Sequence, residues 1–368
     1  MKNTFGNNLT VTLFGESHGK AIGAVIDGMP SGVRIDESYI ALQMDRRRAS
    51  SALSTARREA DQVQILSGVK DGISTGTPIA LMIENTSVRR SDYDDLSDKP
   101  RPSHADYSGY VRYRGNGDAS GGGHFSGRLT APLTAAGAIC QLMLKEKGIS
   151  VMTHIASLHG ICDRPFDEEN LSGDLQILEQ AEFPVLDEAA GEKMKQAIRE
   201  AAADSDSVGG ILATAVSGME AGIGEPWFDS IESMIAHAIF SIPAVKGIEF
   251  GAGFGFEKLK GSEANDPFIL KDKKIQTLTN HNGGVNGGIS NGMPILFQTA
   301  IKPTPSIAKK QKTVDLSEMR ETEIEIKGRH DPAIIHRAVP VIDAMTALVL
   351  CDLLIARFGC DYFGREKE

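Results

Sequence analysis

Alternating apolar and polar positions near the amino terminus predict a pair of neighbouring strands. Residues 9–14, LTVTLF, alternate, and residues 21–28, AIGAVIDG, form a second apolar run after the turn GESHGK. Short runs of this kind, bounded by Gly, Pro, Asn or Asp, are typical of β-strands. By the same criterion we expect further strands at residues 62–69, 78–84, 151–160, 209–218 and 294–302.

Helical periodicity first follows Asp36, a residue type that caps the amino termini of helices. Ile40, Met44 and Arg48 then recur on one stripe at helical spacing. Arg48 is therefore expected to point inward, where a buried guanidinium requires an anionic partner. Further helices are predicted at residues 129–147, 186–203, 228–242 and 341–358.

The order of these elements indicates the fold class. Strands and helices alternate irregularly, and several strands follow one another directly. This order favours an α+β fold with antiparallel sheets over a doubly wound parallel sheet. No segment has the composition of an interdomain linker, so we expect a single domain over residues 1–368.

The most polar stretch runs from residue 101 to residue 128, RPSHADYSGYVRYRGNGDASGGGHFSGR. A run this polar and this rich in glycine cannot fill a hydrophobic core. Its arginines suit phosphate or carboxylate, its histidines titrate near neutral pH, and its glycines let a ligand approach the main chain. On composition alone, a long exposed loop explains the stretch as well as a binding site does.

The turn GESHGK, residues 15–20, nearly matches a phosphate-binding P-loop but is one residue short and is followed by Ala21. The Ser or Thr that would bind Mg²⁺ is missing, which excludes a nucleoside-triphosphatase loop. What remains is His18 between two glycines at a strand end, where a histidine is more often a surface residue than a catalytic one. Comparable polar loops recur at residues 280–292, 302–306 and 328–332. Solvated loops explain any one of them, but explain all of them together poorly.

Composition and charge narrow the possible functions. The chain has 368 residues and a net charge of −10, which argues against general nucleic-acid binding, whereas its clustered arginines suit a small anionic ligand. The 4 cysteines form no C-x-x-C pair, so neither a metal site nor a redox pair is indicated, and Cys140 and Cys351 are expected in the core. The amino terminus lacks the apolar core of a signal peptide, and the strongest apolar run, residues 345–354, is broken by Asp352. We therefore expect a cytoplasmic protein without a membrane anchor.

Taken together, the motifs of this chain resemble the chorismate synthase family over essentially its whole length. Any one motif alone is weak, but their number and order make the match specific. The matching segments are GESHG (15–19), DRRR (45–48), RRE (57–59), QVQILSGV…TGTPI (62–79), RPSHADY (101–107), GGGHFSGR (121–128), DSVGG (206–210), GIGEPWFD (222–229), SIPAVKGIEFG (241–251), NGGVNGGISNG (282–292), KPTPSI (302–307) and KGRHDP (327–332).

The resemblance implies a lyase that acts on 5-enolpyruvylshikimate 3-phosphate, the small-molecule partner of the family. Phosphate and a ring hydrogen leave in a trans-1,4 sense, which gives chorismate, the last product of the shikimate pathway. The reaction consumes no redox equivalents overall, yet the family requires reduced FMN. The implied fold is a single-domain β-α-β sandwich, with helices packed between two antiparallel sheets, and the implied assembly is a homotetramer.

The resemblance also assigns roles to residues. His18 would lie near the leaving phosphate, His104 near the reduced flavin, and Asp331 beside the central flavin ring, as carriers of protons. The phosphate and two carboxylates of the substrate would be neutralised by Arg46, Arg47, Arg48 and Arg128. The positions implied to bind FMN are His124, Phe125, Ser126, Pro243, Ala244, Gly287, Lys302, Pro303, Thr304, Pro305, Ser306 and Arg329.

The chain departs from the family pattern at two places. His124 and Phe125 stand where many members have Arg and Ser, so the first flavin contact lacks a permanent positive charge. The run that follows DRRR lacks an arginine that the family links with NADPH, so nicotinamide binding carries over only onto Arg47. Because the chain also has no dinucleotide fingerprint, we expect it to depend on an external flavin reductase or another supply of reduced flavin.

Two other functions fit the same residues. A transferase acting on phosphorylated shikimate intermediates would use the same arginines without flavin. A non-catalytic module would bind flavin or phosphate without turnover. Phosphate release that depends on reduced FMN separates the lyase from both.

Overall fold

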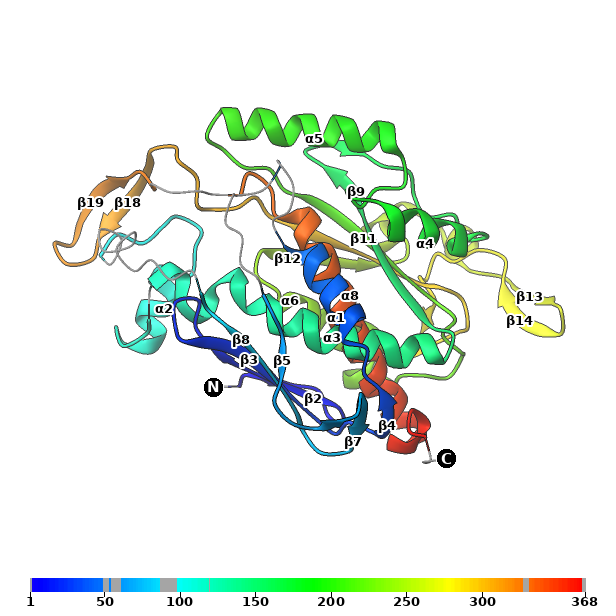
Figure 1. Cartoon of the computed structure of the whole chain (residues 1–368). Coiled ribbons are helices and arrows are strands. Elements are labelled where there is room, and N and C mark those ends of the chain that lie inside the picture. The colour runs from blue at the N-terminus through cyan, green and yellow to red at the C-terminus, as the bar shows by residue number, and fades with distance from the viewer. Residues whose placement is uncertain are drawn as a thin grey trace.

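The computed structural model describes residues 2–48, 53, 61–86, 98–118, 120–326 and 331–365. Two five-stranded sheets dominate it, with long helices between them (Figure 1). In both sheets every neighbouring pair of strands is antiparallel.

The first sheet comes from the amino-terminal part of the chain, in the order β1-β2-β3-β8-β5. Its strands are β1 (Thr4–Phe5), β2 (Thr10–Gly15), β3 (Ala21–Asp27), β8 (Ile79–Glu84) and β5 (Gln64–Ile65). Alternate residues of β8 are buried, as a strand with one face on the core requires. The hairpin of β2 and β3 ends where Gly15 pairs with Ile22, so GESHG lies at the end of this sheet. A smaller sheet contains β4 (Ser31–Arg34), β7 (Ile73–Thr75) and β6 (Val69–Lys70).

The second sheet has the order β10-β9-β11-β17-β12. Its strands are β10 (Ile161–Cys162), β9 (Ser150–Leu158), β11 (Gly210–Ser217), β17 (Ile295–Ile301) and β12 (Val245–Phe250). Helices α4 (Leu171–Gln180) and α5 (Glu188–Ala203) cover its outer side (Figure 1). Helix α6 (Ile231–Phe240) packs on β12 and leads through residues 241–244 into that strand.

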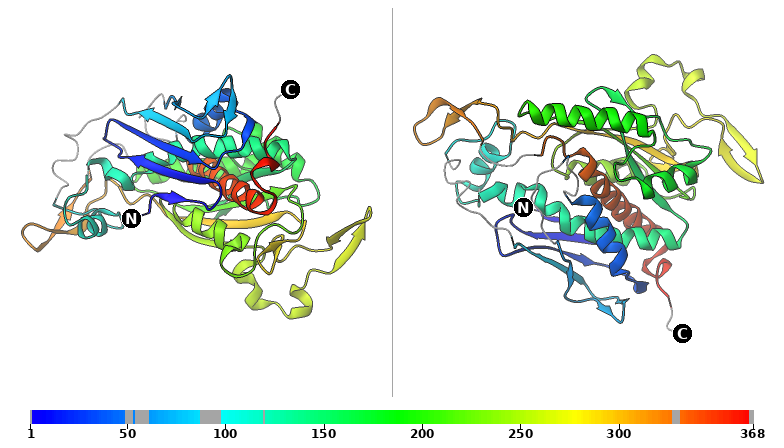
Figure 2. Two further views of the ribbon diagram at one scale, coloured as in Figure 1. Left: turned by 90° about the horizontal axis from the view of Figure 1, so that it is seen from below. Right: turned by 45° about the horizontal axis from the view of Figure 1, so that its top comes forward.

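Helices α1 (Glu37–Arg47), α3 (Thr130–Glu146) and α8 (Ile335–Phe358) fill the space between the sheets (Figure 2). α3 contacts β2, β3 and β8 of the first sheet and β9 of the second, whereas α8 contacts β9 and β11. One continuous cluster of buried apolar residues includes side chains from both sheets and all three helices. The sheets are therefore joined through a common core.

Helix α8 is long and apolar enough to cross a membrane, but its whole apolar window is buried inside the protein. Its carboxylate Asp352 is satisfied there, because the backbone amides of Asn7, Asn8 and Leu9 donate to it at 2.9, 2.7 and 3.0 Å. The composition of α8 thus reflects its place at the centre of the core.

Three hairpins and several short helices complete the described chain. The hairpins are β13 (Phe268–Lys271) with β14 (Lys274–Thr277), β15 (Val285–Asn286) with β16 (Ile289–Ser290), and β18 (Gln311–Asp315) with β19 (Arg320–Ile324). The short helices are α2 (Asp106–Tyr113), η2 (Ser120–Phe125), η3 (Gly127–Leu129), η4 (Trp227–Asp229), η5 (Gly253–Lys258), α7 (Gly261–Ala264) and η6 (Cys360–Tyr362).

Most of the predicted elements are found, and the predicted mixture of helices and antiparallel sheets is confirmed. The N-cap at Asp36 is confirmed, since its carboxylate accepts the amides of Ser38 and Tyr39. Cys140 and Cys351 are buried, as expected.

Two sequence-based predictions are wrong. Residues 62–69 do not form one strand, because β5 and β6 belong to different sheets. Arg48 is only half-buried, because the helix ends at Arg47 and Arg48 continues in an extended conformation; Arg47 is the buried arginine of this run, 5% exposed. Of the two explanations of residues 101–128, one long exposed loop does not hold, because the stretch contains α2 and η2.

We predict that Gly137→Ala destabilises the fold. Gly137 lies where α3 and α8 touch, and a Cβ there would collide with the backbone and Cβ of Ala344. Overpacking of this kind typically costs about 1–3 kcal/mol, which denaturant unfolding would measure. Gly255→Ala is the matched control, since a Cβ there meets nothing within 4 Å. Equal stability of the two variants would contradict the close approach of the helices.

Candidate active site

Two histidines meet at one glycine turn. Gly121 and Gly122 have φ values of 61° and 93°, a conformation that favours glycine. A Cβ on Gly121 would collide with the imidazole of His18, and a Cβ on Gly122 would lie 3.6 Å from Nε2 of His104. The turn therefore separates the two imidazoles by backbone alone, and the missing side chains leave room for both.

His18 is held in one orientation by its neighbour Ser17. The Oγ of Ser17 donates to the carbonyl of Ser120 at 3.0 Å and lies 3.0 Å from Nδ1 of His18. Because the single hydroxyl proton goes to the carbonyl, Nδ1 of His18 is the donor in the second contact. His18 is only 3% exposed, so it is not the surface residue that a histidine in a turn usually is.

His104 belongs to a compact group of charged side chains. Its Nδ1 lies 2.6 Å from Oδ1 of Asp106, and the guanidinium of Arg101 donates to both oxygens of the same carboxylate at 2.7 and 2.8 Å. Burial alone would raise the pKa of the Asp106 carboxyl, but the hydrogen bonds from Arg101 and His104 outweigh it and hold that pKa well below its usual range.

The segment KPTPS is joined to this group. Nζ of Lys302 donates to the carbonyl of Ser103 at 2.5 Å, and Arg101 donates to Oγ of Ser306 at 3.4 Å. Burial, together with nearby Lys246, lowers the pKa of Lys302. The backbone amide of Lys302 also donates to the carbonyl of Ala244 at 2.9 Å. The structure thus brings Pro243, Ala244 and residues 302–306 next to His104.

Most of the other residues with an implied flavin contact also lie nearby. His124 is anchored through Nδ1, 2.9 Å from the carbonyl of Gly15, while Phe125 is 42% exposed and Ser126 caps η3. Gly287 does not join them: it lies beside the hairpin residue Gly288, which packs on Ser230 at the start of α6, whereas Ala244 follows the end of that helix. Arg329 lies outside the described residues.

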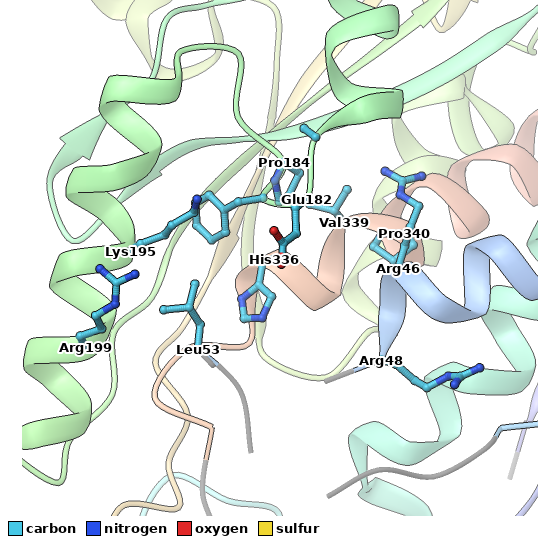
Figure 3. Close-up of a pocket in the computed structure, with 12 residues that line it drawn as sticks. Arg46, Arg48, Leu53, Glu182, Pro184, Lys195, Arg199, His336, Val339 and Pro340 are labelled. Atoms are coloured by element: carbon cyan, nitrogen blue, oxygen red, sulfur yellow. The ribbon is translucent and has the colours of Figure 1, made fainter. Parts of the chain in front are cut away.

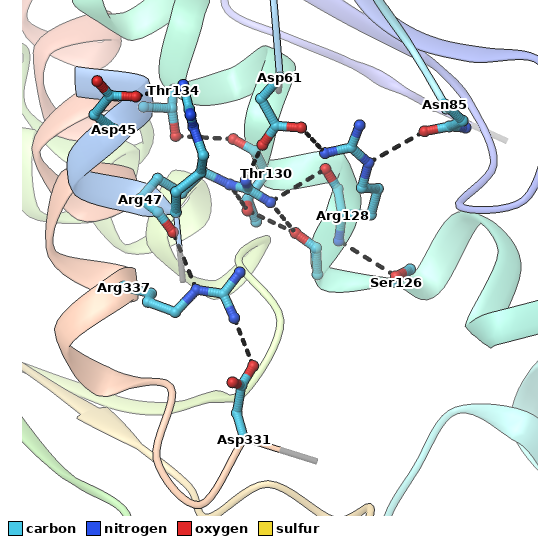
Figure 4. A network of polar contacts seen from close by, with 12 residues as sticks. Asp45, Arg47, Asp61, Asn85, Ser126, Arg128, Thr130, Thr134, Asp331 and Arg337 are labelled. Carbon is cyan, nitrogen blue, oxygen red and sulfur yellow. Dashed lines mark hydrogen bonds and ion pairs between the residues drawn. The ribbon is translucent and has the colours of Figure 1, made fainter. Parts of the chain in front are cut away.

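Arg47 and Arg128 share one buried carboxylate (Figure 4). Asp61, 6% exposed, pairs with Nη1 of Arg47 at 3.1 Å and with Nη1 of Arg128. Arg47 also donates to Oγ1 of Thr130 at 2.9 Å and to the carbonyl of Gly127 at 3.2 Å. Arg47 is therefore fixed by the protein itself, and it holds the residues that precede α3.

Arg46 and Arg48 do not gather with Arg47 and Arg128. They line a cavity of about 230 Å³ between α1, α5 and the start of α8, opposite Lys195 and Arg199 (Figure 3). Burial raises the pKa of Asp343, 3.7 Å from Arg46, to about 6. His336, which also lines the cavity, is neutral at pH 7, because burial and nearby Arg337 lower its pKa to about 4. The four arginines predicted to bind one substrate thus divide between two neighbouring places.

Asp331 pairs with Nη1 of Arg337 at 2.5 Å, and Nε of the same arginine donates to the backbone carbonyl of Arg47 at 3.0 Å. Arg337 thereby connects the carboxylate of the KGRHDP motif to the end of α1 (Figure 4). The carbonyl of Pro332 accepts the amide of Val208 at 2.8 Å, which ties the same turn to the start of β11.

Sequence reasoning missed the residues that orient the predicted ones: Ser17, Asp61, Arg101, Asp106 and Arg337. Ser17, Arg101 and Asp106 belong to motifs that were already singled out. Their closeness in sequence to a predicted histidine could have identified them as its partners. Asp61 and Arg337 stand just outside the matched motifs and carry no such signal.

Comparison with known proteins gives one consistent result. The family model described as chorismate synthase matches residues 9–355. Chorismate synthases of Methanosarcina barkeri and Pyrococcus abyssi are each 46% identical, over 96% of this chain and over 96% and 97% of their own lengths. The fold is similar to a crystal structure of a chorismate synthase, with a TM-score of 0.75, 29% identity, and coverage of 97% of this chain and 94% of that one.

We predict that Gly121→Ala slows turnover strongly, because the new methyl group must displace His18. Loss of a positioned proton donor typically costs about 10²–10⁴-fold. The measurement is phosphate release with saturating reduced FMN, beside a melting curve. Gly127→Ala controls for a methyl group in the same segment, since a Cβ there meets nothing within 4 Å. Native-like turnover of Gly121→Ala would mean that this contact has no part in the reaction.

Proposed function

The chain belongs to the chorismate synthase family, and from this premise we propose how its residues divide the reaction among them. Enzymes of this family eliminate phosphate from 5-enolpyruvylshikimate 3-phosphate to give chorismate, and they require reduced FMN. The observation that carries the proposal is the pair His18 and His104 on one glycine turn, with cationic side chains around it. This pair of histidines suits a reaction in which an anion leaves while a proton is donated or accepted nearby.

We assign His18 to the leaving phosphate and His104 to the flavin. Nδ1 of His18 is engaged by Ser17, so a proton given to a phosphate oxygen would come from Nε2 of the protonated imidazole. Arg128 would bind an anionic group of the substrate directly. Arg47 would act through Asp61 and Arg128, and Arg46 and Arg48 would raise the local positive potential from the neighbouring cavity.

The residues around KPTPS fit a bound flavin. Oγ1 of Thr304 is buried and has no hydrogen-bond partner among the described residues, as expected of a group that receives a ligand. Lys302, partly desolvated beside Lys246, suits an anion, and its backbone amide donates to the carbonyl of Ala244. His124, Phe125, Ser126, Pro243, Ala244, Pro303, Pro305 and Ser306 would complete the flavin site. When bound, reduced FMN supplies an electron-rich partner for the substrate ring. The role of Arg329 stays a proposal from the family pattern.

We propose that Asp331 receives the proton that leaves the substrate ring. Its ion pair with Arg337, which also donates to the carbonyl of Arg47, holds the carboxylate near the end of α1. The alternative is a carboxylate that only stabilises its own turn. An amide can replace a turn acceptor but is a far weaker base.

We also propose that the finer architecture is a single-domain β-α-β sandwich and that the assembly is a homotetramer. The common core between the sheets supports the first. Phe268, Leu270 and Ile275 of the projecting hairpin β13–β14, each at least 69% exposed, support the second, because apolar surface of this kind marks protein interfaces. Gly287, remote from the other flavin positions of its own chain, would then face a neighbouring copy. Sedimentation equilibrium would measure this assembly.

A cytoplasmic location is part of the same proposal. All four cysteines are free thiols, and Cys162 and Cys360 are exposed, which suits a reducing compartment.

We predict that Asp331→Asn lowers turnover by about 10²–10⁴-fold while FMN binding is retained. The decrease should also appear in single-turnover decay of the flavin signal. Asp315→Asn is the matched control, because Asp315 accepts the amides of Ser317 and Glu318 in a turn away from the site. Normal turnover in Asp331→Asn, with unchanged melting temperature, would leave Asp331 as a turn residue.

We predict that the protein forms no chorismate in air when it is given NADPH and FMN without a flavin reductase. The reason is the missing arginine after DRRR and the absence of a dinucleotide fingerprint from the sequence. Added reductase should restore the reaction. Robust product without reductase would show that the chain reduces flavin itself, and Arg47 would then be tested for nicotinamide binding.

A further inference from the structure

The group formed by Arg101, His104 and Asp106 has one feature that the established reaction does not explain. Two nitrogens converge on a single carboxylate oxygen: Nδ1 of His104 lies 2.6 Å from Oδ1 of Asp106, and Nη2 of Arg101 lies 2.8 Å from the same atom. The two nitrogens themselves are 3.1 Å apart. Asp106 further accepts the backbone amide of Arg101 at 2.9 Å, so its position is fixed from two sides.

These distances decide which nitrogen of His104 carries the proton. If Nδ1 were unprotonated, its lone pair would face a carboxylate oxygen at 2.6 Å, and the two would repel each other. With a proton on Nδ1 the same contact is a short charge-assisted hydrogen bond. The 3.1 Å contact with Arg101 is then the result of two donors that share one acceptor, not a hydrogen bond.

The contact through Nδ1 also fixes the direction of the other ring nitrogen, Nε2. Nε2 of His104 faces the glycine turn, 3.6 Å from the place of a Cβ on Gly122. Among the described residues, Lys302 is a further charged group at this loop, with its Nζ bound to the carbonyl of Ser103; His18 lies on the other side of the turn. Of these described neighbours, Asp106 supplies the carboxylate that contacts the ring of His104.

We propose that Asp106 is a positioning residue, which keeps the proton on Nδ1 of His104 and directs Nε2 toward the glycine turn. This inference deepens the proposed function, because it rests on His104 acting at the flavin. A histidine held in this way has one neutral tautomer, and its second proton, when present, is always on the nitrogen that faces the ligand.

The test follows His104 without flavin. Slow exchange of the imidazole Cε1 hydrogen for deuterium, measured by mass spectrometry on the peptide that contains His104, gives a pH midpoint in the whole chain. In Asp106→Asn we expect this midpoint to fall by about one pH unit or more, since an opposite charge at this distance is lost. Asp106→Glu, which keeps the charge, should restore most of the shift. The midpoint of His154, which pairs with Asp163, is the internal control.

A matched variant controls for loss of a carboxylate near the turn. Asp118→Asn removes a carboxylate that accepts the amide of Ser120, in the same segment but away from His104. It should leave the midpoint of His104 unchanged. Misfolding is not expected to obscure the result, because Asp106 begins α2, and no residue of that helix belongs to the main core cluster of the described chain.

Turnover separates this inference from the proposed function. If both hold, Asp106→Asn loses about tenfold or more in turnover, and its activity disappears at a lower pH than that of the native protein. An unchanged midpoint in Asp106→Asn would overturn the positioning role. A lowered midpoint with native turnover would uphold it and count against His104 as a participant, which His104→Ala would show independently.

Discussion

The rest of the structure depends on the burial of helix α8 between two sheets. A helix that is apolar on all sides is stable in water only when other elements surround it completely. α3 supplies one flank, and Gly137 lets the two helices approach so closely that no side chain fits between them. The strands of both sheets then pack on this helical layer. At the start of α8, Arg337 joins Asp331 to the end of α1, next to the pairs that Asp61 forms with Arg47 and Arg128.

At that place the charged residues satisfy one another. Asp61 lies between two arginines, Asp106 between an arginine and a histidine, and Asp331 against Arg337. Burying an unpaired charge is costly, so each carboxylate both permits and orients its cationic neighbours. The assigned histidines, His18 and His104, are both held through Nδ1, which fixes the orientation of each ring.

The sequence predicted the long elements well, because α1 and α5 have amphipathic periodicity and Asp N-caps and the longer strands are apolar runs bounded by turn residues. It could not predict that residues 62–69 divide between two sheets, since local pattern carries no information on pairing partners. The error over which arginine is buried has a similar cause. The predicted apolar stripe extends to Arg48, one residue past the end of the helix, where the backbone is extended and the side chain no longer follows the helical stripe. Motifs singled out the histidines and the proposed flavin positions, but the partner residues Asp61 and Arg337 emerge only from the fold.

The shared carboxylate of Asp61 has a consequence for ligand selection. Arg128 already has a counter-ion and an amide partner in Asn85 before any ligand arrives. An incoming anion therefore adds to an ordered guanidinium rather than immobilising a free one, and little conformational entropy is lost on binding. The anion is also attracted only by the part of the positive charge of Arg128 that Asp61 does not neutralise. Small inorganic anions, which offer one weak contact, would gain little here, whereas a ligand that engages several such groups at once would be selected by its shape.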